Sequence, residues 1–576
     1  MRESVIWKIG GEAGFGIMSS GMMLARTFSR AGYHTFATNE YPSLIRGGHN
    51  AVAVRVAVER FEAMSRGVDL LIALNKETVD VHKGELPDGG FVVYDPHDSE
   101  PKAQDFHASV HLIALPLAEI VKSASGDPVM RNTVALGATI AILGTDFERL
   151  AAVIRDQFQR KGDDVVAFNL SFARKGYDYV KEHYAKEASL YISPAKTAEK
   201  QMIINASEAV GVGAARAGMK FAAIYPMTPI NSLITFLADH EKQLKIVYLQ
   251  PEDEIAGINM AIGASIAGVR SMVATSGGGF ALMVEGLALA GMVEVPIVID
   301  LGMRVGPATG MPTWTEQGEL LFAIHAGHGE FPRIVLAPSD AAEAYTLTIV
   351  AFQLADRYQV PVFVLTDKYI NESNWCVPMR HFQGDVVIDR GLLVSPKDVP
   401  KDGSFRRYTT DIPDGVSPRS IPGMKGGFYQ ANSYEHDEVG YVTEDAMSRT
   451  RMVDKRLKKF AAIERDMKPP TIYGDAQADV AFVSWGSSRG PVMDAMKLLK
   501  QKRVRSKLIH FSYVYPFPPA AAALLSKEKR LIDVEQNATA QLAQLIRTHA
   551  GIEIKEKILK YDGRPFFPEE IAERVT

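Results

Sequence analysis

The chain has 576 residues, of which 47% are hydrophobic and 23% charged, and its formal net charge is −4. This length is sufficient for about three or four domains of ordinary size, and the composition is typical of a globular enzyme. Because the net charge is slightly negative, long-range attraction to nucleic acid or to an anionic membrane is excluded as a basis for function.

The sequence contains a single cysteine, Cys376. One cysteine excludes an intrachain disulfide, and it excludes a zinc or iron–sulfur centre whose cysteine ligands all come from this chain. The N-terminus has no signal-peptide core, and the most apolar region, residues 255–303, is interrupted by Arg270, Glu285 and Glu294. No membrane-spanning segment is therefore expected, and the chain is predicted to be cytoplasmic.

Residues 4–40 have the pattern of a strand, a glycine turn, an amphipathic helix and a second strand, which is the opening of a doubly wound α/β unit. Short apolar runs suited to buried parallel strands follow at residues 69–75, 89–95 and 109–116. Helical pattern continues toward the end of this part of the chain. We therefore predict a first α/β domain over residues 1–195.

The turn after the first strand is rich in glycine, with Gly10, Gly11, Gly14 and Gly16 in the segment GGEAGFG. Bare backbone N–H groups beside a helix N-terminus favour an anion, and Glu40 after the second strand is a candidate ribose-binding acid. The spacing from Gly11 reads G-x-x-G-x-G and departs from the G-x-G-x-x-G dinucleotide pattern. NAD binding and tight strand–helix packing both remain open as explanations.

A loop is expected within residues 40–50, EYPSLIRGGHN, where Arg46 stands beside Gly47 and Gly48. The glycines allow the backbone to come close to a ligand, and Arg46 could pair with a phosphate or a carboxylate. A solvated turn explains the same residues.

A second α/β series begins with a helix at residues 206–218, and its apolar runs are typical of buried strands: residues 220–226, 245–250, 270–276, 295–302 and 360–367. We predict a domain over residues 196–375, then a mostly irregular connection over 376–470 with one charged helix at 443–466. The charge run of that helix is interpreted as a solvated face. A last α/β series over 471–576 completes three consecutive α/β domains.

The segment YPMTP, residues 225–229, follows an apolar run and places Thr228 directly before Pro229. Proline fixes φ and restricts the preceding residue to extended conformations, so this segment predicts a rigid elbow at the end of a strand. A stiff strand-to-helix connection explains this segment equally well.

Acidic residues begin the helix predicted from QPEDEIAG, and Glu254 stands one turn ahead of a stripe of glycine and alanine. Acids in a first turn suit the helix dipole, so helix initiation alone explains them. The small-residue stripe allows another backbone to approach closely, which would shield Glu254 from water.

Arg304 follows the strand expected at residues 295–302 and leads a loop that contains Thr309 and Thr313. Open α/β sheets bind ligands at the carboxyl ends of their strands. A charged side chain at this point is therefore interpreted as part of a substrate site.

The segments YPMTP, EDEIAGINMAIGAS, TSGGGFALM and RVGPATGMPT occur in this order along the chain. In this combination the chain resembles the α subunit of the 2-oxoacid:ferredoxin oxidoreductases, which are thiamine diphosphate enzymes. GGEAGFG and EYPSLIRGGHN resemble the γ subunit of that family, and WGSSRGPVMDA, YPFP and VEQNATAQL resemble its transketolase C-terminal-like domain. The resemblance covers nearly the whole chain, and the fused γ–α order is similar to the 2-oxoglutarate-preferring, KorA-like type.

The resemblance implies a gamma-type domain, a pyrimidine-binding thiamine diphosphate domain and a transketolase C-terminal-like domain. It implies that Glu254 contacts N1′ of the aminopyrimidine and exchanges a proton with it, as the catalytic acid–base. It also implies that Thr228 and Pro229, in the elbow, meet the cofactor, and that Thr228 is presented to the substrate.

Around the substrate, the resemblance implies that Arg304 binds a carboxylate of the 2-oxoacid and that Thr309 and Thr313 supply hydrogen bonds around its 2-oxo group. The loop with Arg46, Gly47 and Gly48 is placed on the coenzyme A side. The implied reaction is oxidative decarboxylation of 2-oxoglutarate to succinyl-CoA and CO2 with reduction of ferredoxin, or its reverse, which fixes CO2. Pyruvate or a broad range of 2-oxoacids is the alternative.

The sequence lacks a G-D-G motif for diphosphate and Mg²⁺, and a single cysteine cannot hold an iron–sulfur cluster. A β subunit is therefore expected to supply the diphosphate and Mg²⁺ sites and a [4Fe-4S] cluster, in an (αβ)2 assembly. No metal ligand is assigned to this chain. Coenzyme A is the expected co-substrate, and ferredoxin is the expected electron acceptor.

Three other functions fit parts of the sequence. GGEAGFG alone would suit an NAD-dependent oxidoreductase, and the α-subunit segments would also suit a transketolase-like transferase without electron transfer. Reduction of ferredoxin or of a viologen separates both from the main prediction. A non-catalytic scaffold subunit is the third, and an inactive Glu254→Ala complex would exclude it.

Overall fold

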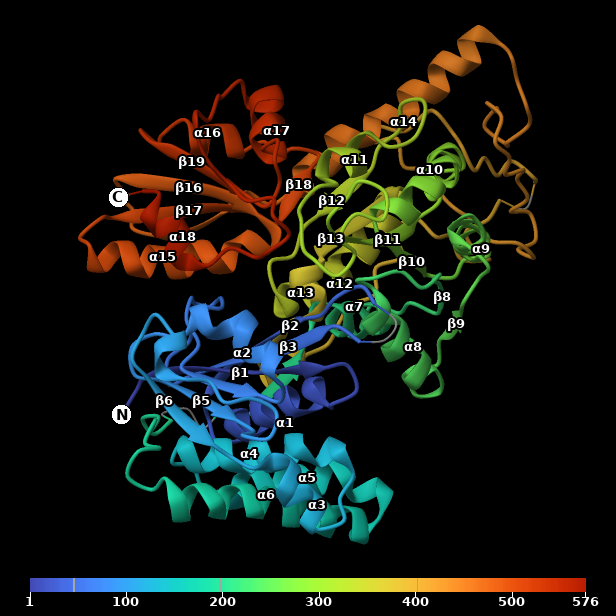
Figure 1. Ribbon diagram of the computed structural model, residues 1–576. Helices are drawn as coiled ribbons and strands as arrows, with labels where there is room; N and C mark the ends of the chain where they lie inside the picture. The colour runs from blue at the N-terminus through green and yellow to red at the C-terminus, as the bar shows by residue number, and fades with distance from the viewer. Residues whose placement is uncertain (45–46, 196–198, 401, 576) are drawn as a thin grey trace. The chain divides into compact units, whose positions relative to one another are not determined.

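The structure is a computed structural model that describes residues 1–44, 47–195, 199–400 and 402–575. The chain divides into two compact units (Figure 1), of which unit 1 comprises Met1–Ile204, Ser373–Phe382 and Phe567–Glu569. Unit 2 comprises Asn205–Glu372, Gln383–Phe566 and Glu570–Thr576. Among the described residues, none of the helices has the length and apolar character that a bilayer crossing requires.

Unit 1 is built on a mixed sheet with the strand order β6-β5-β4-β1-β3-β2-β14-β7. Its strands are β1 (Ser4–Glu12), β2 (His34–Glu40), β3 (His49–Ala57), β4 (Leu70–Ala73), β5 (Gly90–Tyr94), β6 (Val110–Ala114), β7 (Gln201–Ile204) and β14 (Asn374–Pro378). Strands β1, β4, β5 and β6 run parallel, which confirms the apolar runs predicted after residue 68. The second strand does not pair with the first, because β3 lies between them and is antiparallel to both.

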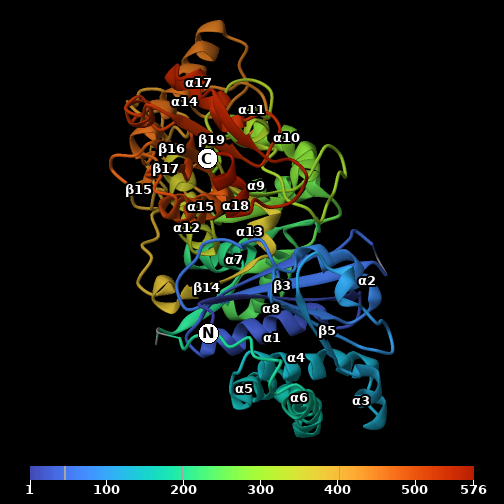
Figure 2. The ribbon, with the colours of Figure 1, turned by 60° about the vertical axis from the view of Figure 1, so that its left-hand side comes forward.

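Helices cover this sheet, and in Figure 2 the last three of them lie side by side. They are α1 (Ile17–Arg30), α2 (Lys76–His82), α3 (Leu117–Ser123), α4 (Arg131–Ile142), α5 (Phe147–Phe158) and α6 (Asp163–His183). Helices α4 and α6 approach closely because Gly137 and Gly176 each face the backbone of the other helix, and an added methyl group at either would overlap a carbonyl oxygen. Trp7 and Phe28 lie fully buried in the core.

The glycine-rich segment GGEAGFG differs from its prediction as a turn. Strand β1 continues to Glu12, so Gly10 and Gly11 are strand residues, and an added Cβ at Gly10 would crowd Thr78 and His49. The start of α1 is also filled, because Asn132 Nδ2 donates to Phe15 O at 2.9 Å and lies against Gly16. Of the two explanations, the structure supports tight strand–helix packing, and the NAD interpretation is not supported.

Two strands of this sheet come from beyond the predicted first domain, residues 1–195. Strand β7 pairs with β14, and β14 pairs with β2. Cys376 lies in β14, where its Sγ is 2.8 Å from Thr35 Oγ1. The sheet of unit 1 therefore includes a segment from the predicted second domain and the start of the predicted connection, while the domain boundaries at 195, 375 and 470 stay predictions.

Unit 2 contains a seven-stranded sheet with the order β18-β12-β13-β11-β10-β8-β9. Its strands are β8 (Phe221–Ala223), β9 (Val247–Leu249), β10 (Ser271–Thr275), β11 (Ile297–Met303), β12 (Ile334–Leu336), β13 (Pro361–Asp367) and β18 (Tyr513–Tyr515). All pairs are parallel except the one between β12 and β18. Strands β10, β11 and β13 are buried along their whole length, as continuous apolar runs predict.

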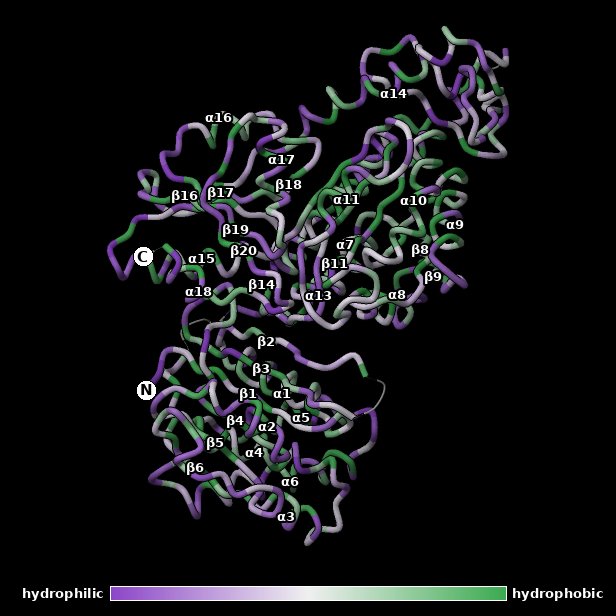
Figure 3. The backbone as a smooth tube through the Cα atoms, turned by 45° about the horizontal axis from the view of Figure 1, so that its top comes forward, coloured by the Kyte–Doolittle hydropathy of each residue, from purple (hydrophilic) through white to green (hydrophobic). Residues whose placement is uncertain are grey.

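The helices of this part are α7 (Ala206–Arg216), α8 (Asn231–Leu244), α9 (Glu254–Ile266), α10 (Gly277–Met292), α11 (Leu320–His325), α12 (Ala341–Tyr358) and α13 (Lys368–Glu372). Figure 3 shows that α9 and α10 are among the most hydrophobic segments of the chain. Helix α9 packs on α10, where Gly286 leaves room for Ile258.

The other sheet of unit 2 has the order β15-β17-β16-β19-β20. Its elements are β15 (Thr471–Gly474), β16 (Val480–Trp485), β17 (Ser506–Phe511), β19 (Leu531–Glu535), β20 (Glu556–Leu559), α15 (Arg489–Gln501), α16 (Ala521–Leu525), α17 (Gln541–Ala550) and α18 (Pro568–Glu573). One buried core contains side chains from both sheets of unit 2, including Phe363, Trp485 and Phe511. The structure thus has three sheets, with helices and strands that alternate along the chain, which confirms the predicted α/β fold class.

The predicted charged helix is α14 (Ala446–Asp466), but part of its charge is buried. Lys455 and Lys459 are each about 1% exposed, and each places Nζ 2.6 Å from a carboxylate oxygen of Glu294. Arg456 is also buried, and it donates to Glu435 at 2.7 Å. The interpretation as a solvated face is wrong for these residues, because a charge run does not reveal which charges meet a buried partner.

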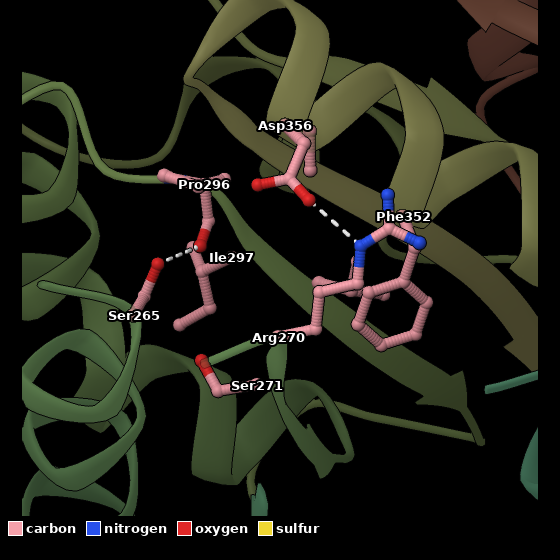
Figure 4. A pocket seen from close by; sticks show the side chains of 9 residues that line it. Ser265, Arg270, Ser271, Pro296, Ile297, Phe352 and Asp356 are labelled. Atoms are coloured by element: carbon pink, nitrogen blue, oxygen red, sulfur yellow. Dashed lines mark hydrogen bonds and ion pairs between the residues drawn. The ribbon is translucent and has the colours of Figure 1, made fainter. Parts of the chain in front are cut away.

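A buried carboxylate also anchors the irregular connection. Asp356 of α12 pairs with Arg270 at 2.7 Å and with Arg419 of the connection at 2.8 Å. Beside this cluster lies a small cavity, where Ser265 Oγ donates to Pro296 O at 2.6 Å (Figure 4). With a volume of about 10 Å³, the cavity has room for a water molecule and not for a substrate.

Candidate active site

The elbow YPMTP connects the end of β8 to the start of α8, as predicted. The Thr228–Pro229 peptide bond is cis, and Pro229 lies against β11 at Gly302. A Cβ at Gly302 would be 3.1 Å from Pro229 Cγ and 2.9 Å from Ile230 Cγ2, so the missing side chain lets the elbow rest on the strand. Thr228 is partly exposed, and Asn231 Nδ2 is 3.5 Å from its hydroxyl oxygen.

Arg304 follows β11 directly and reaches the elbow. Its Nη1 donates to the backbone oxygen of Thr228 at 2.8 Å. Burial lowers the pKa of Arg304, and the carboxyl group of Glu319 opposes that shift. Guanidinium groups have pKa values above about 12, so a partly buried and charged side chain remains at the carboxyl end of the sheet.

Glu254 is the first residue of α9, but another acid caps this helix. Asp253 is the N-cap residue, and its carboxylate accepts from the backbone N–H of Ala256 at 2.8 Å. Glu254 is 3% exposed, and within the described parts of the chain its Oε1 has no hydrogen-bond partner. Helix capping therefore does not explain Glu254, and burial of an unpartnered carboxylate oxygen is costly unless a ligand satisfies it.

The turn between β10 and α10 brings Glu254 close to the elbow. An added methyl group at Gly279, in the first turn of α10, would overlap both the Glu254 carboxylate and the Thr275 hydroxyl group. Thr275 Oγ1 in turn lies 3.9 Å from Met227 Sδ in the elbow. The segments YPMTP, EDEIAG and TSGGG, which are separate in sequence, thus meet at one place.

A second carboxyl group lies at the same helical turn and was missed from the sequence. An added Cβ at Gly277 would be 2.6 Å from Glu319 Oε1, and Glu319 Oε2 is buried without a partner among the described residues. Burial and the nearby carboxyl group of Glu316 raise the pKa of Glu319 to about 8, against the opposing charge of Arg304. The acids in TWTEQGEL, the last part of the loop that begins with Arg304, were the available signal.

The segment that carries Glu319 is held by the C-terminal sheet of unit 2. Gln317 N donates to Gln536 O at 2.7 Å, and Ser488 Oγ donates to Gln317 Oε1 at 2.8 Å. Gln541 Nε2 donates to Gly318 O at 2.7 Å. The segments WGSS and VEQNATAQL therefore position the end of the substrate loop, which sequence alone did not indicate.

The other predicted site residues are less closely connected. Thr309 is exposed in the loop after β11, Thr313 is buried, and no described contact joins either residue to Arg304. In unit 1, Gly47 and Gly48 both have positive φ, at 75° and 81°, which glycine adopts without strain. Arg46 lies outside the described residues.

No cluster of three or more His, Cys, Asp or Glu side chains suitable for a metal ion occurs in the described ranges. The geometry does offer one part of a cofactor site, namely a buried carboxylate oxygen without a partner beside a turn without side chains. These residues fit the aminopyrimidine end of thiamine diphosphate, whose ring nitrogen can exchange a proton with a carboxyl group.

Comparison with known proteins shows the family of this chain. Residues 6–179 match the family described as pyruvate ferredoxin/flavodoxin oxidoreductase. Residues 212–455 match a second family, described as the thiamine diphosphate-binding part of pyruvate flavodoxin/ferredoxin oxidoreductase. The chain is 33% identical to the alpha subunit of 2-oxoacid:ferredoxin oxidoreductase 2 of Aeropyrum pernix, over 98% of this chain and 96% of that protein. It is 27% identical to the 2-oxoglutarate oxidoreductase subunit KorA of Mycobacterium tuberculosis, over 99% of this chain and 91% of that protein.

A solved structure is also similar along the full length. It is the 2-oxoglutarate:ferredoxin oxidoreductase from Magnetococcus marinus with 2-oxoglutarate, coenzyme A and succinyl-CoA bound, with 32% sequence identity and a TM-score of 0.92. The match covers 100% of this chain and 99% of that chain. Fold and site define an oxidoreductase of 2-oxoacids with a thiamine diphosphate-binding domain. The chain belongs to the family of 2-oxoacid:ferredoxin oxidoreductase alpha subunits, which confirms the resemblance found in the sequence.

Proposed function

We propose that this chain is the α subunit, fused to a gamma-type domain, of a coenzyme A-dependent oxidoreductase that prefers 2-oxoglutarate. The reaction is oxidative decarboxylation to succinyl-CoA and CO2 with reduction of ferredoxin, and the reverse direction fixes CO2. The full-length similarity to a 2-oxoglutarate:ferredoxin oxidoreductase and to a KorA subunit supports this choice of substrate. Oxidation of pyruvate or of many 2-oxoacids is the competing proposal.

The observation that carries the proposal is the Glu254 carboxylate. It is buried, its Oε1 is unpartnered in the described parts of the chain, and the Asp253 side chain already caps the helix. We assign Glu254 as the acid–base group that holds and moves a proton at N1′ of thiamine diphosphate. The bound cofactor supplies the nucleophilic carbon that attacks a 2-oxo group.

The elbow and the strand end are assigned to the substrate and cofactor. Thr228 and Pro229 form the wall against the cofactor, and Thr228 presents its hydroxyl group to the substrate. Arg304 is assigned to a substrate carboxylate, because its guanidinium group has a carbonyl oxygen as its described partner and offers further N–H donors. Thr309 and Thr313 are assigned to hydrogen bonds around the 2-oxo group.

A β subunit completes the proposed enzyme in an (αβ)2 assembly. It carries the diphosphate and Mg²⁺ sites and a [4Fe-4S] cluster, because this sequence contains no G-D-G motif and only one cysteine. The Arg46–Gly48 loop of unit 1 is proposed for the coenzyme A side. Ferredoxin then accepts the electrons.

The test is co-expression with the β subunit and an assay of coenzyme A-dependent reduction of ferredoxin or methyl viologen. We expect kcat/KM for 2-oxoglutarate to exceed that for pyruvate, and we expect the chain without its partner to contain no stoichiometric iron. Equal kcat/KM values would favour the broad-range proposal. Absence of reduction with every 2-oxoacid would contradict the proposed function.

The role of Arg304 has its own test in the same complex. If Arg304 binds the carboxylate that all 2-oxoacids share, Arg304→Ala lowers kcat/KM for 2-oxoglutarate and pyruvate alike. If it binds the distal carboxylate, only 2-oxoglutarate is affected. Lysine at this position should restore little, because it keeps the charge but loses the planar fork. Unchanged values for both substrates would remove Arg304 from the site.

A further inference from the structure

Two carboxyl groups from other segments lie against the first turn of α10, and the proposed function uses only Glu254. Glu254 lies against Gly279, and Glu319 lies against Gly277, two residues earlier. Gly278 between them has room for a methyl group, since the nearest atom to an added Cβ is Ala308 O at 3.9 Å, an ordinary van der Waals contact. The glycine triplet therefore leaves room for two separate carboxyl groups, and Glu319 has no assigned role.

Hydrogen bonds to the residues on both sides of Glu319 fix the position of this part of the chain. Gln317 and Gly318 are held by Gln536, Ser488 and Gln541, and the backbone N–H of Leu321 donates to Gln541 Oε1 at 2.9 Å. The segment on both sides of Glu319 is thus fixed to the C-terminal sheet. Its Oε2 nevertheless remains buried and unpartnered in the described ranges.

The charges that face Glu319 come from three other parts of unit 2. Arg304 follows β11, Asp367 ends β13, and Glu316 stands at the end of the substrate loop. Asp367 already accepts hydrogen bonds from the Ser487 hydroxyl group and from Ile370 N, and Glu316 accepts one from Gly306 N. Arg304 is the only facing cation described, and Arg304 and Glu319 make no direct ion pair in the described structure.

We propose that Glu319 is a titratable positioning residue whose charge state sets how strongly Arg304 attracts an anionic substrate group. This inference rests on the proposed role of Arg304 as a carboxylate-binding residue. When Glu319 is protonated, the positive charge of Arg304 is available to the substrate carboxylate. When Glu319 is ionised, its negative charge competes for Arg304 and repels that carboxylate.

The direction of the pH dependence follows from the environment. Burial and Glu316 raise the pKa of Glu319 to about 8, so Glu319 is mostly protonated at neutral pH and ionises as the pH rises through about 8. The KM of the 2-oxoacid should therefore increase over this range. At an effective dielectric constant near 20, the ionised carboxylate of Glu319 should raise KM roughly tenfold.

The first experiment needs no substrate. Because the folded-state pKa of Glu319 is raised, its contribution to stability is fully present below the unfolded-state pKa and is lost as the pH rises through about 8. The Tm of the wild-type chain should thus fall relative to Glu319→Gln between pH 5 and 9. In Arg304→Ala this titration should shift to higher pH, since the opposing positive charge is gone. An unchanged titration midpoint would overturn the coupling between the two residues.

The second experiment measures KM and kcat of the complex with the β subunit between pH 6.5 and 9.5. Glu319→Gln should remove this increase, so that the ratio of the KM values at pH 9.5 and pH 6.5 falls from roughly ten in the wild type to near one. A wild-type increase that persists in Glu319→Gln would overturn the proposal. If the complex oxidises no 2-oxoacid, the proposed function fails, and the stability titration alone decides whether Glu319 acts on Arg304.

A matched pair of glycine variants tests whether the position of the Glu319 carboxylate matters, without a change in its charge. Gly277→Ala pushes the Glu319 carboxylate, the flexible end of its side chain, whereas Gly278→Ala makes only an ordinary van der Waals contact with Ala308 O. Both variants gain the same helix propensity. We expect Gly277→Ala to move the pH midpoint of KM and Gly278→Ala to leave it unchanged. Equal behaviour of the two variants would show that Glu319 does not act from this position.

Discussion

The buried carboxylates near the two ends of helix α10 differ in whether they have charged partners. At the N-terminal end, Glu254 and Glu319 each have an oxygen without a partner in the described part of the chain. Just beyond the C-terminal end, Glu294 is 1% exposed and meets Lys455 and Lys459. Burial alone would raise the pKa of Glu294, but these cations hold it well below its usual range.

This difference predicts that the paired carboxylate contributes to folding and that the carboxylates with an unpartnered oxygen contribute to function. A buried carboxylate with two lysines is compensated, so its removal should affect folding. A buried carboxylate oxygen without a partner costs stability in the absence of a ligand, so its removal should affect function more than folding. The following changes test whether the two ends really differ in this way.

The largest expected effect is on catalysis at the N-terminal end. Glu254→Gln should lower kcat of the complex by about 10²- to 10⁴-fold, because an amide cannot exchange the proton that a carboxyl group does. The matched control is Glu252→Gln, since Glu252 is an exposed acid of the same run. Activity of Glu254→Gln within twofold of the wild type would return Glu254 to a structural role and would leave a scaffold function open.

At the other end, Glu294→Ala should lower the free energy of unfolding by about 3–5 kcal/mol, because it leaves two buried lysines without their anion. Thermal unfolding of the purified chain measures this as a lower Tm. The control is Asp479→Ala, which removes the partner of Arg505 in an exposed ion pair and should change Tm little. A Tm of Glu294→Ala equal to that of the control would show that the lysine pair is not structural.

A smaller effect is expected when the carboxylate is displaced instead of removed. Gly279→Ala puts a methyl group where Glu254 and Thr275 now lie, and misplacement by about 1 Å can cost roughly 10²-fold in rate. Gly278→Ala, where a methyl group fits without overlap, is the control for any change in helix propensity. If both variants keep wild-type kcat, the contact between Gly279 and Glu254 has no catalytic importance.

The smallest expected effect concerns Asp300, a buried carboxyl group on β11 that lies at neither end of α10. Burial raises the pKa of Asp300 to about 7 although Thr366 donates to it at 3.0 Å. Its contribution to stability is therefore present below the unfolded-state pKa near 4 and is lost as the pH rises through about 7. Between pH 5 and pH 8, the wild type should therefore lose about 2–3 kcal/mol of stability relative to Asp300→Asn.

Denaturant unfolding of both proteins at pH 5 and pH 8 measures this difference, with kcat as a second readout. A stability difference that is the same at both pH values would contradict the titration of Asp300. A loss of kcat as large as in Glu254→Gln would show that Asp300, whose Oδ2 has no hydrogen-bond partner among the described residues, is also part of the catalytic site.

The sequence was informative where local physics decides the outcome. Continuous apolar runs predicted β10, β11 and β13, and the prolines predicted the elbow before α8. It misplaced Gly10 and Gly11, which belong to β1, because glycine content alone does not distinguish a turn from a strand that packs closely on neighbours. It also missed Glu319, since an acid after a loop has no local pattern that separates a buried site from a solvated one.

By itself, the sequence determined the order of the elements, the single cysteine, the missing G-D-G motif and the position of Glu254 in a first helical turn. Only the tertiary structure decided which carboxylates are paired. Lys455 and its partner Glu294 are 161 residues apart, and no periodicity in a linear chain reports such a contact. Pairing depends on which side chains the packed sheets and helices bring within a few ångströms of one another. In the low effective dielectric of the interior, a nearby opposite charge strongly stabilises a carboxylate, and a carboxylate without one is costly unless a ligand satisfies it.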